Sequence, residues 1–374
     1  MHNNLLKGVS AVFGAMALSS AAMAADVNIW NWSDYMGETT VADFEKAANL
    51  DANYAMFDSN ELVEARLLSG HSGFDVTMMT SYYIPRLAKA GALEKLDKSL
   101  LSNYDKLDKK RMEMLASIDE GNNYAIPFAE ISLGFGYNQE KIDEIFGKGT
   151  VIDKWEFIFN KENSRKLKKC GIAVLDSPIE VISSVMHYLK EDPTSEKAAD
   201  YAKAKELLTS LATDVSYFHS SRYINDLASG DICFAIGYSG DILQAADRAV
   251  TAKRGYTIKY EFPRDGSLLW YDCWAIPKGA SNFENGHKWI NFLMEKEVAS
   301  SVSNQIRYIL PVTDAMELLA TELKENKSVN LDEEHLKAAY FPTPPTAKVS
   351  RITNNIWNYM KLNSDNEDDG SGWE

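Results

Sequence analysis

Short apolar runs alternate with longer amphipathic stretches along the first part of the chain. Residues 27–32, 53–57 and 74–79 have the length and composition of buried strands, and each precedes a stretch with helical character. Ser59 or Asn60 can cap the second of these helices. Repeated strand–helix–strand order of this kind predicts a parallel sheet covered by helices on both faces.

A second α/β region is expected from about residue 141 to about residue 254. Before it, apolar residues alternate over 131–137, which predicts a strand that carries the chain from one domain to the next. A chain of 374 residues is long enough for two domains of ordinary size. Further strands are predicted at 232–236, 257–262 and 268–276, and further helices from Ser177, over 198–211 and from about 285 to 303.

Both ends of the chain differ from this pattern. Lys7, the apolar stretch Gly8–Leu18 and the small residues Ala22-Met23-Ala24 together predict a cleaved secretory signal over residues 1–24. No cysteine follows the small residues, so a lipoprotein anchor is not indicated, and no later segment is apolar enough to span a membrane. The tail 363–374 is polar and acidic and is expected to be disordered.

Composition narrows the class of partner. The formal net charge of −15 argues against nucleic acid and is compatible with steering of cations. Export implies an oxidising compartment, where three cysteines allow one disulfide, although the residues alone do not choose the pair. The sequence has no Cys-x-x-Cys, no histidine cluster and no glycine-rich phosphate loop, so it predicts neither a metal nor a cofactor.

Two aspartates stand in or beside stretches that otherwise have the composition of buried strands. Asp272 lies inside the apolar and aromatic run 268–276, and Asp241 follows the apolar strand 232–236. A buried carboxylate without a partner costs several kcal/mol or gives up its charge. No Lys or Arg lies in the run around Asp272, so a cationic ligand flanked by aromatic faces is a natural partner. Asp241 can alternatively cap the helix that follows it.

Polar and aromatic residues gather at the ends of the predicted strands. Ligands of open α/β sheets bind beyond the carboxyl ends of the strands. The pattern therefore predicts one site that is drawn from several loops and lies between two α/β lobes. The clusters are 32–35, 80–81, 238–241 and 270–272.

Several blocks of sequence carry a family resemblance. They are Asn31–Tyr35, Phe57–Glu61, Tyr217–Ser221 with Tyr223–Ala228, and Gly230–Cys233. In this order they resemble the periplasmic polyamine-binding proteins, the spermidine/putrescine receptors of bacterial ABC importers, and most closely the putrescine-binding branch. The resemblance covers nearly the whole mature chain.

The resemblance implies an α/β, two-lobed type II periplasmic binding fold with the ligand in a cleft between the lobes. The lobes would be 25–132 plus about 256–302, and 133–255 plus about 303–362. It also implies a periplasmic monomer that performs no reaction on its ligand. Hinge closure would produce a closed form that an inner-membrane ABC permease recognises.

Individual residues inherit roles from the same resemblance. Glu180 matches a glutamate that holds one ammonium group, and Asp241 and Asp272 match the two family aspartates. The other implied residues are Trp32, Ser33, Asp34 and Tyr35 of the first-strand motif, the hydroxyl residue Ser81, the aromatic wall Tyr308, and the disulfide partners Cys170 and Cys233, which leave Cys273 free.

Three residues depart from the family pattern: the first bears on putrescine affinity, and the other two bear on the preferred length of the ligand. Tyr238 stands where the family usually has Trp, so one stacking face is smaller and carries a hydroxyl. Trp270 is the larger aromatic of spermidine-preferring relatives, where putrescine binders often have Phe. Glu130 takes a position where relatives tend to place an aromatic, and a carboxylate facing the cleft would suit a longer or more highly charged polyamine.

Alternatives remain for several residues and for the function. Ser177 and Glu180 fit a capping box, Asp34 can cap a helix, the aromatics can be core residues, and His219 can be a hydrogen-bonded structural residue. The same fold could serve a sensor that reports to a membrane signalling protein. A hydrolase with two carboxylates as acid and base is a further class, although nothing in the sequence marks its machinery.

Overall fold

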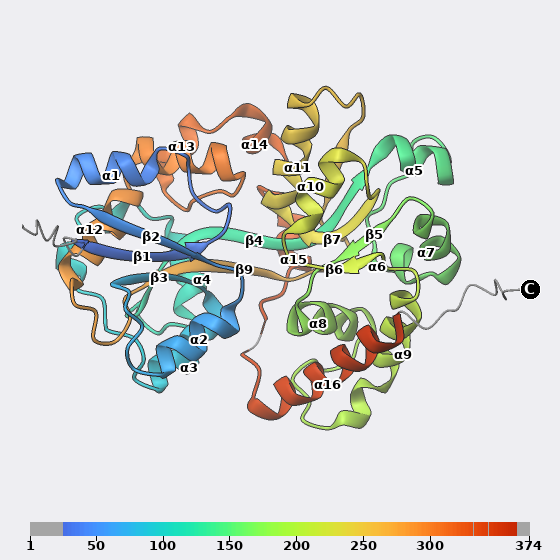
Figure 1. Cartoon of the computed structure of the whole chain (residues 1–374), viewed down its shortest axis with the longest axis horizontal. Helices are drawn as coiled ribbons and strands as arrows, with labels where there is room; N and C mark the ends of the chain where they lie inside the picture. The colour runs from blue at the N-terminus through green and yellow to red at the C-terminus, as the bar shows by residue number, and fades with distance from the viewer. Residues whose placement is uncertain (1–24, 332, 343, 365–374) are drawn as a thin grey trace, which may run out of the picture.

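The computed structural model describes residues 25–364 except 332 and 343. It has two lobes, and each is a sheet with helices packed around it (Figure 1). The predicted signal 1–24 and the acidic residues from 365 onward lie outside the described residues. Residues 363 and 364, expected to begin a disordered tail, instead end the helix α16 (Ala347–Ser364). No helix in the described part of the chain is long and apolar enough to cross a membrane.

The first lobe is built on β1 (Val27–Trp32), β2 (Ala52–Phe57), β3 (Val76–Thr80) and β9 (Leu269–Ala275). β1 pairs in parallel with β2 and β3, as the strand–helix–strand order predicts. β9 adds antiparallel to β3. The helix expected over 285–303 is two helices, α12 (Phe283–Leu293) and α13 (Lys296–Ile306). The other helices of this lobe are α1 (Thr40–Ala48), α2 (Asn60–Leu68), α3 (Ile84–Lys89) and α4 (Lys109–Ala116).

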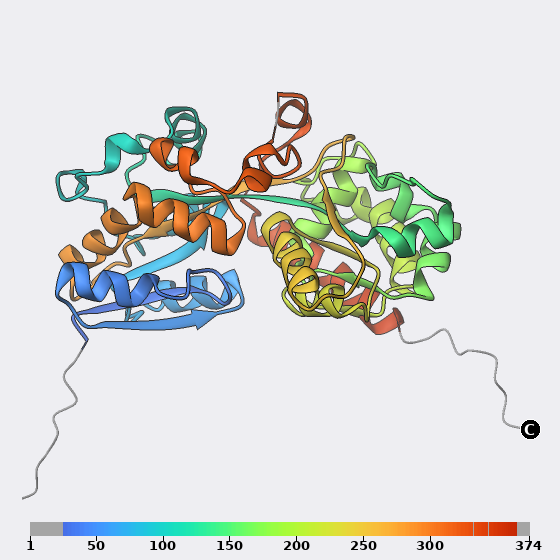
Figure 2. The same ribbon diagram turned by 90° about the horizontal axis from the view of Figure 1, so that it is seen from above.

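One long strand joins the two lobes. β4 (Ala125–Asn138) is buried over its whole length and runs from one lobe into the other (Figure 2). Its first part, Ala125–Ser132, pairs antiparallel with β9, and Leu133–Tyr137 pairs antiparallel with β7 (Phe234–Tyr238) of the second lobe. The alternation over 131–137 therefore does mark a connecting strand. Because β4 and β9 run against their neighbours, the sheet is mixed rather than wholly parallel.

The second lobe contains a parallel set of β7, β5 (Ile172–Val174) and β6 (Tyr217–Phe218). β8 (Ile258–Glu261) pairs with Phe135–Asn138 of β4, so it belongs to this lobe, whereas the expected boundary near 256 placed it in the first. The remaining helices are α5 (Gln139–Phe146), α6 (Trp155–Phe159), α7 (Lys161–Lys168), α8 (Pro178–Tyr188), α9 (Ala202–Ala212), α10 (Arg222–Ser229) and α11 (Ser239–Thr251) in this lobe, with α14 (Thr321–Glu325) and α15 (Glu333–Ala338) in the chain that leads back to it.

A disulfide fastens the parallel strands of the second lobe together. Cys170 and Cys233 are bonded, with 5.5 Å between their Cα atoms, and they stand just before β5 and β7. The pairing implied by the family resemblance is confirmed. Cys273 is free and buried within β9.

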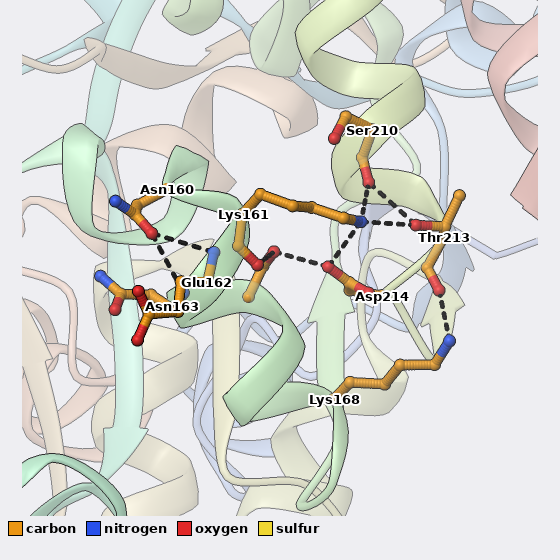
Figure 3. Close-up of polar contacts among 9 residues, drawn as sticks. Asn160, Lys161, Glu162, Asn163, Lys168, Ser210, Thr213 and Asp214 are labelled. Carbon is orange, nitrogen blue, oxygen red and sulfur yellow. Dashed lines mark hydrogen bonds and ion pairs between the residues drawn. The ribbon is translucent and has the colours of Figure 1, made fainter.

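A buried carboxylate also ties α7 to the end of α9. Asp214 Oδ2 accepts hydrogen bonds from Lys161 Nζ at 2.8 Å and from Ser164 Oγ at 2.6 Å (Figure 3). Lys161 Nζ donates further to Ser210 O and Thr213 Oγ1, both at 2.7 Å. Asp214 is only 2% exposed, so its charge depends on these partners.

We expect Lys161→Met to lower the free energy of unfolding by about 1–3 kcal/mol, because the buried carboxylate of Asp214 loses its charged partner. The loss is moderated because the Lys161 side chain is 30% exposed rather than fully buried. Urea unfolding monitored by circular dichroism measures this change. Lys166→Met on the same helix is the matched control: its ion pair with Glu162 is exposed, and we expect a change below about 1 kcal/mol. Equal losses in the two variants would contradict the role given to Asp214.

Candidate functional site

A cavity of about 500 Å³ is lined by residues of both lobes. In the first lobe, lining residues follow the ends of β1, β2 and β3, and in the second lobe they follow β5, β6 and β7. These are the carboxyl ends of parallel strands, where ligands of open α/β sheets bind. β4, β9, α16 and the residue Tyr308 complete the lining.

The lining is acidic and offers no fixed cation. Among the described residues around the cavity, none is a Lys or an Arg. Asp176 already has a cationic partner that does not line the cavity, because Lys361 Nζ lies 2.8 Å from its Oδ2. The carboxylates that line the cavity are Asp58, Glu61, Asp176, Glu180, Asp241 and Asp272.

Asp272 is a buried acid in the middle of β9. It stands opposite Thr80 in the antiparallel pair with β3, and Thr80 Oγ1 donates a hydrogen bond to its Oδ1 at 3.0 Å. Burial raises the pKa of Asp272 to about 7 despite this hydrogen bond. The side chain therefore sits close to the point at which it exchanges its charge for a proton, and a nearby cation would hold it ionised.

Asp241 lies in the first turn of α11. Tyr223 OH donates to its Oδ2 and Tyr308 OH to its Oδ1, both at 2.7 Å. Burial raises the pKa of this carboxyl to about 6, and the two hydroxyls oppose that shift. The residue at the N-cap of α11 is Tyr238, so the helix-cap alternative for Asp241 is wrong.

Glu180 lies in the first turn of α8 and is also held by two tyrosines. Tyr82 OH donates to its Oε1 at 3.0 Å and Tyr238 OH to its Oε2 at 2.7 Å. Burial raises the pKa of Glu180 as well. Ser177 makes no capping hydrogen bond through its side chain, so the capping box that the sequence allowed does not form.

Aromatic rings fill the space between the acids. Trp270 meets Tyr238 edge to face, with 5.7 Å between ring centroids, and Tyr35 meets Tyr308 at 5.2 Å. Trp32 packs at 4.4 Å against Phe57 at the end of β2. All of these rings except Phe57 line the cavity, so the wall between the acids is largely aromatic.

Three residues expected at the site are not among those that line the cavity. Asp34 has 61% of its side chain exposed, points toward Arg248 at 3.9 Å and caps no helix, because α1 begins at Thr40. Ser81 is buried, and its Oγ accepts a hydrogen bond from Tyr271 N at 3.3 Å. By contrast, Trp32, Ser33 and Tyr35 of the same first-strand motif do line it.

Glu130 is the third of these residues, and it has a partner inside the protein. Arg111 Nε donates to its Oε2 at 3.2 Å and Tyr271 OH donates to the same oxygen at 3.1 Å. The side chain is therefore charge-compensated from α4. The structure does not bring it to the cavity with Glu180, Asp241 and Asp272.

Several residues of the site escaped the sequence analysis. Tyr82 and Thr80 come from the end of β3, where the polar cluster was recognised but only Ser81 was assigned a role. Tyr223 is fully buried, does not itself line the cavity and reaches the site through its hydrogen bond to Asp241, and its block was quoted for the family resemblance alone. His219, which lines the cavity, accepts hydrogen bonds at Nδ1 from the backbone of Ser221 and Arg222, in keeping with a structural role.

Comparison with known proteins supplies the family. The model of the family described as bacterial extracellular solute-binding protein matches residues 39–330. The chain belongs to this family. The putrescine-binding periplasmic protein SpuD of Pseudomonas aeruginosa is 39% identical over 93% of this chain and 95% of its own length. The putrescine-binding periplasmic protein PotF of Escherichia coli is 36% identical over 92% of this chain and 95% of its own length.

A solved structure shows the same architecture. A putative spermidine/putrescine ABC transporter protein from Listeria monocytogenes superimposes with a TM-score of 0.78 at 26% identity, covering 90% of this chain and 98% of that one. The fold is thus the two-lobed type II fold of periplasmic binding proteins. As a member of a solute-binding family, the chain is a binding protein rather than an enzyme.

The raised pKa of Asp272 predicts a stability that depends on pH. A folded pKa of about 7 lies above the ordinary aspartate value of about 3.9, so the protonated form stabilises the fold at low pH and this stabilisation is lost as pH rises through about 7. We expect Asp272→Asn to gain up to about 4 kcal/mol over the unliganded wild type at pH 8, and almost nothing at pH 4.

Thermal unfolding of ligand-free protein at the two pH values measures this difference. Glu130→Gln is the control, because it removes a buried carboxylate that Arg111 already compensates, and we expect it to destabilise the protein at pH 8. A pH-independent effect of Asp272→Asn would contradict the assignment.

Proposed function

We propose that this protein captures a polyamine in the periplasm and delivers it to an ABC importer. The observation that carries the proposal is the cavity in which buried carboxylates are held by hydroxyls, with no Lys or Arg among the described lining residues. Aliphatic amines remain protonated at neutral pH, as lysine does with a pKa of about 10.4. A ligand with several ammonium groups supplies the charge that these acids lack.

The arrangement of acids and rings suits an amine at each end of an apolar chain. Glu180 and Asp241 of the second lobe would hold one ammonium group, and Asp272 of the first lobe the other or an inner nitrogen. Trp32, Trp270 and Tyr238 would pack on the methylene groups, with cation–π attraction of about 0.5–2 kcal/mol per contact. Charge-assisted hydrogen bonds of about 1.5–3 kcal/mol each can then reach micromolar affinity, roughly −8 kcal/mol.

The relatives support this class of ligand. The two curated proteins reported above are named for putrescine, and the Listeria structure for spermidine and putrescine. Two residues bear on which polyamine is preferred. The Tyr238 hydroxyl donates a hydrogen bond to Glu180, and the large ring of Trp270 lines the cavity. Glu130 is compensated by Arg111, so it supplies no evident extra charge for a longer polyamine. Putrescine and spermidine are both retained as ligands.

The remaining parts of the proposal concern location and partners. Both curated relatives are named as periplasmic, which supports export of this chain through residues 1–24 and a mature protein that begins at Ala25. We infer that the mature protein acts as a monomer and that its closed form is read by an inner-membrane permease. The sensor and hydrolase alternatives gain no support from these relatives.

We expect the protein purified from a periplasmic extract to have the mass of a chain that begins at Ala25. We also expect it to bind putrescine or spermidine with micromolar or tighter affinity. Carried-over ligand is removed by unfolding and refolding, and calorimetry compares putrescine, cadaverine, spermidine and spermine. Asp272→Asn should weaken binding about 10–150-fold, because one charge-assisted contact is lost.

Glu130→Gln is the matched control, since it neutralises a buried carboxylate on the neighbouring strand, and its affinity should remain within about twofold of the wild type. Loss of binding in Glu130→Gln would instead place that residue against the ligand. Absence of heat with all four amines would overturn the polyamine proposal.

Binding should also release protons and strengthen with pH. The free carboxyls of Asp241 and Asp272 have pKa values raised to about 6 and about 7, and an ammonium group favours their ionised forms. From pH 5.5 to pH 8, Asp272 alone should tighten putrescine binding about 30-fold. Calorimetry at pH 7 in buffers of different ionisation enthalpy counts the released protons, and an affinity that is flat over this range would contradict the scheme.

A further inference from the structure

Each of the two acids contributed by the second lobe is held by two tyrosines in a repeated pattern. One oxygen of Glu180 accepts from Tyr238 of β7, and the other accepts from Tyr82 beside β3. One oxygen of Asp241 accepts from Tyr223 of α10, and the other accepts from Tyr308 after α13. For each acid, one donor therefore belongs to the same lobe and the other to the opposite lobe.

The lobe of each donor follows from its packing. Tyr82 lies in the 3-10 turn η1 (Ser81–Tyr83), which continues β3 of the first-lobe sheet. The expected boundary near 303 placed Tyr308 in the second lobe, but its packing is with the first: it follows α13, its ring contacts Tyr35, and Asp108 N donates to Pro311 O nearby at 2.8 Å. Tyr223 and Tyr238 are part of the second lobe, where Tyr223 OH also accepts a hydrogen bond from Tyr238 N at 3.1 Å.

Other contacts run along the same junction. Gln244 Nε2, one turn beyond Asp241 on α11, donates to Ile306 O at 3.1 Å, and Arg307 forms an ion pair with Asp247 further along the helix. The ring of Tyr308 lies so close to Gly240 that a Cβ there would come within 2.4 Å of it. α11 and the end of α13 therefore meet tightly when the lobes are in this arrangement.

We propose that Tyr82 and Tyr308 are closure latches: positioning residues whose hydroxyls bond the opposite lobe's carboxylates only when the lobes are together. The inference rests on the proposed function and deepens it. A hydrogen bond within one lobe survives opening and adds nothing to the difference between the two states. A hydrogen bond across the lobes exists only in the closed state, so its whole strength counts toward closure.

The latches leave room for the ligand. Each carboxylate oxygen has two lone pairs, and one hydroxyl occupies only one of them. An ammonium group can therefore join Glu180 or Asp241 without displacing Tyr82 or Tyr308. Closure would then gain from the ligand and the tyrosines together, and the residence time of the ligand would depend on the hydrogen bonds between the lobes as well as on the groups that hold the ligand.

Tyrosine-to-phenylalanine substitutions remove, at the same acid, either the hydrogen bond that crosses the lobes or the one within a single lobe. At Glu180 the pair is Tyr82→Phe across the lobes and Tyr238→Phe within one lobe, and at Asp241 it is Tyr308→Phe and Tyr223→Phe. Pulsed electron resonance between spin labels on Leu68→Cys and Val250→Cys, both exposed, reports the distance between lobes with and without saturating putrescine. Stopped-flow tryptophan fluorescence gives the rate of putrescine release.

We expect the cross-lobe variants to shift the closed-to-open ratio toward open by about 10–100-fold and to release putrescine faster by a similar factor. The same-lobe variants should leave that ratio within about twofold of the wild type, even where their affinity falls. Equal ratios in both classes, or a shift only in the same-lobe variants, would overturn the latch.

The test distinguishes failure of the latch from failure of the proposed function. If the wild type binds no polyamine, the polyamine proposal fails, and the ligand-free distance distributions of the four variants still decide the latch. A thermal transition in each variant identifies any that has not folded. If one of the two variants at Glu180 or at Asp241 does not fold, the pair of variants at the other acid is compared instead.

Discussion

The whole site depends on keeping negative charge on carboxylates that the protein largely shields from water. A carboxylate removed from water needs compensation from a cation or from hydrogen bonds, or else it takes up a proton. Two buried acids elsewhere in the described chain receive a cation: Glu130 has Arg111 and Asp214 has Lys161. At the cavity, Glu180, Asp241 and Asp272 receive hydroxyls instead.

This difference in partner explains how the site can be both folded and receptive. Hydroxyl donors stabilise a carboxylate enough to be built into the fold, yet they bring no positive charge. Because the negative charge is not fully compensated, burial raises the pKa values of Asp241 and Asp272 to about 6 and about 7. An arginine at either place would be a better structural partner and would leave no reason for a cationic ligand to enter.

Much of the fold and part of the site follow from local sequence. Val27–Trp32 reads as a strand because a short apolar run between polar turns leaves few alternatives, and Asp272 stands out because its neighbours are all apolar or aromatic. The partner of an acid cannot be found in this way. Arg111 is 19 positions from Glu130 and Tyr82 is 98 positions from Glu180, so only the folded topology brings each pair together.

The same limit explains the errors about helix ends and sheet direction. Glu180 and Asp241 have the spacing of capping residues, and the pattern carries no information about tyrosines arriving from another element. Antiparallel β9 closes the first-lobe sheet from far along the chain, whereas the strand–helix–strand order describes only neighbours in sequence. Family resemblance pointed to the acids that line the cavity because it compares whole chains, but the structure leaves three other expected site residues, Asp34, Ser81 and Glu130, outside the cavity lining.

The position of β9 late in the chain has a consequence for the order in which the protein folds. Thr80 and Asp272, opposite each other in the sheet, are 192 residues apart in sequence. The first strands of this lobe therefore cannot complete their sheet until β9, the last strand of the described chain, is available, which is the kind of distant pairing that slows folding. The second lobe, whose sheet and disulfide lie within residues 133–261, needs no such wait. The last of the acids that line the cavity thus arrives with the strand that completes the first-lobe sheet, and a chain that ends before β9 lacks part of the binding site.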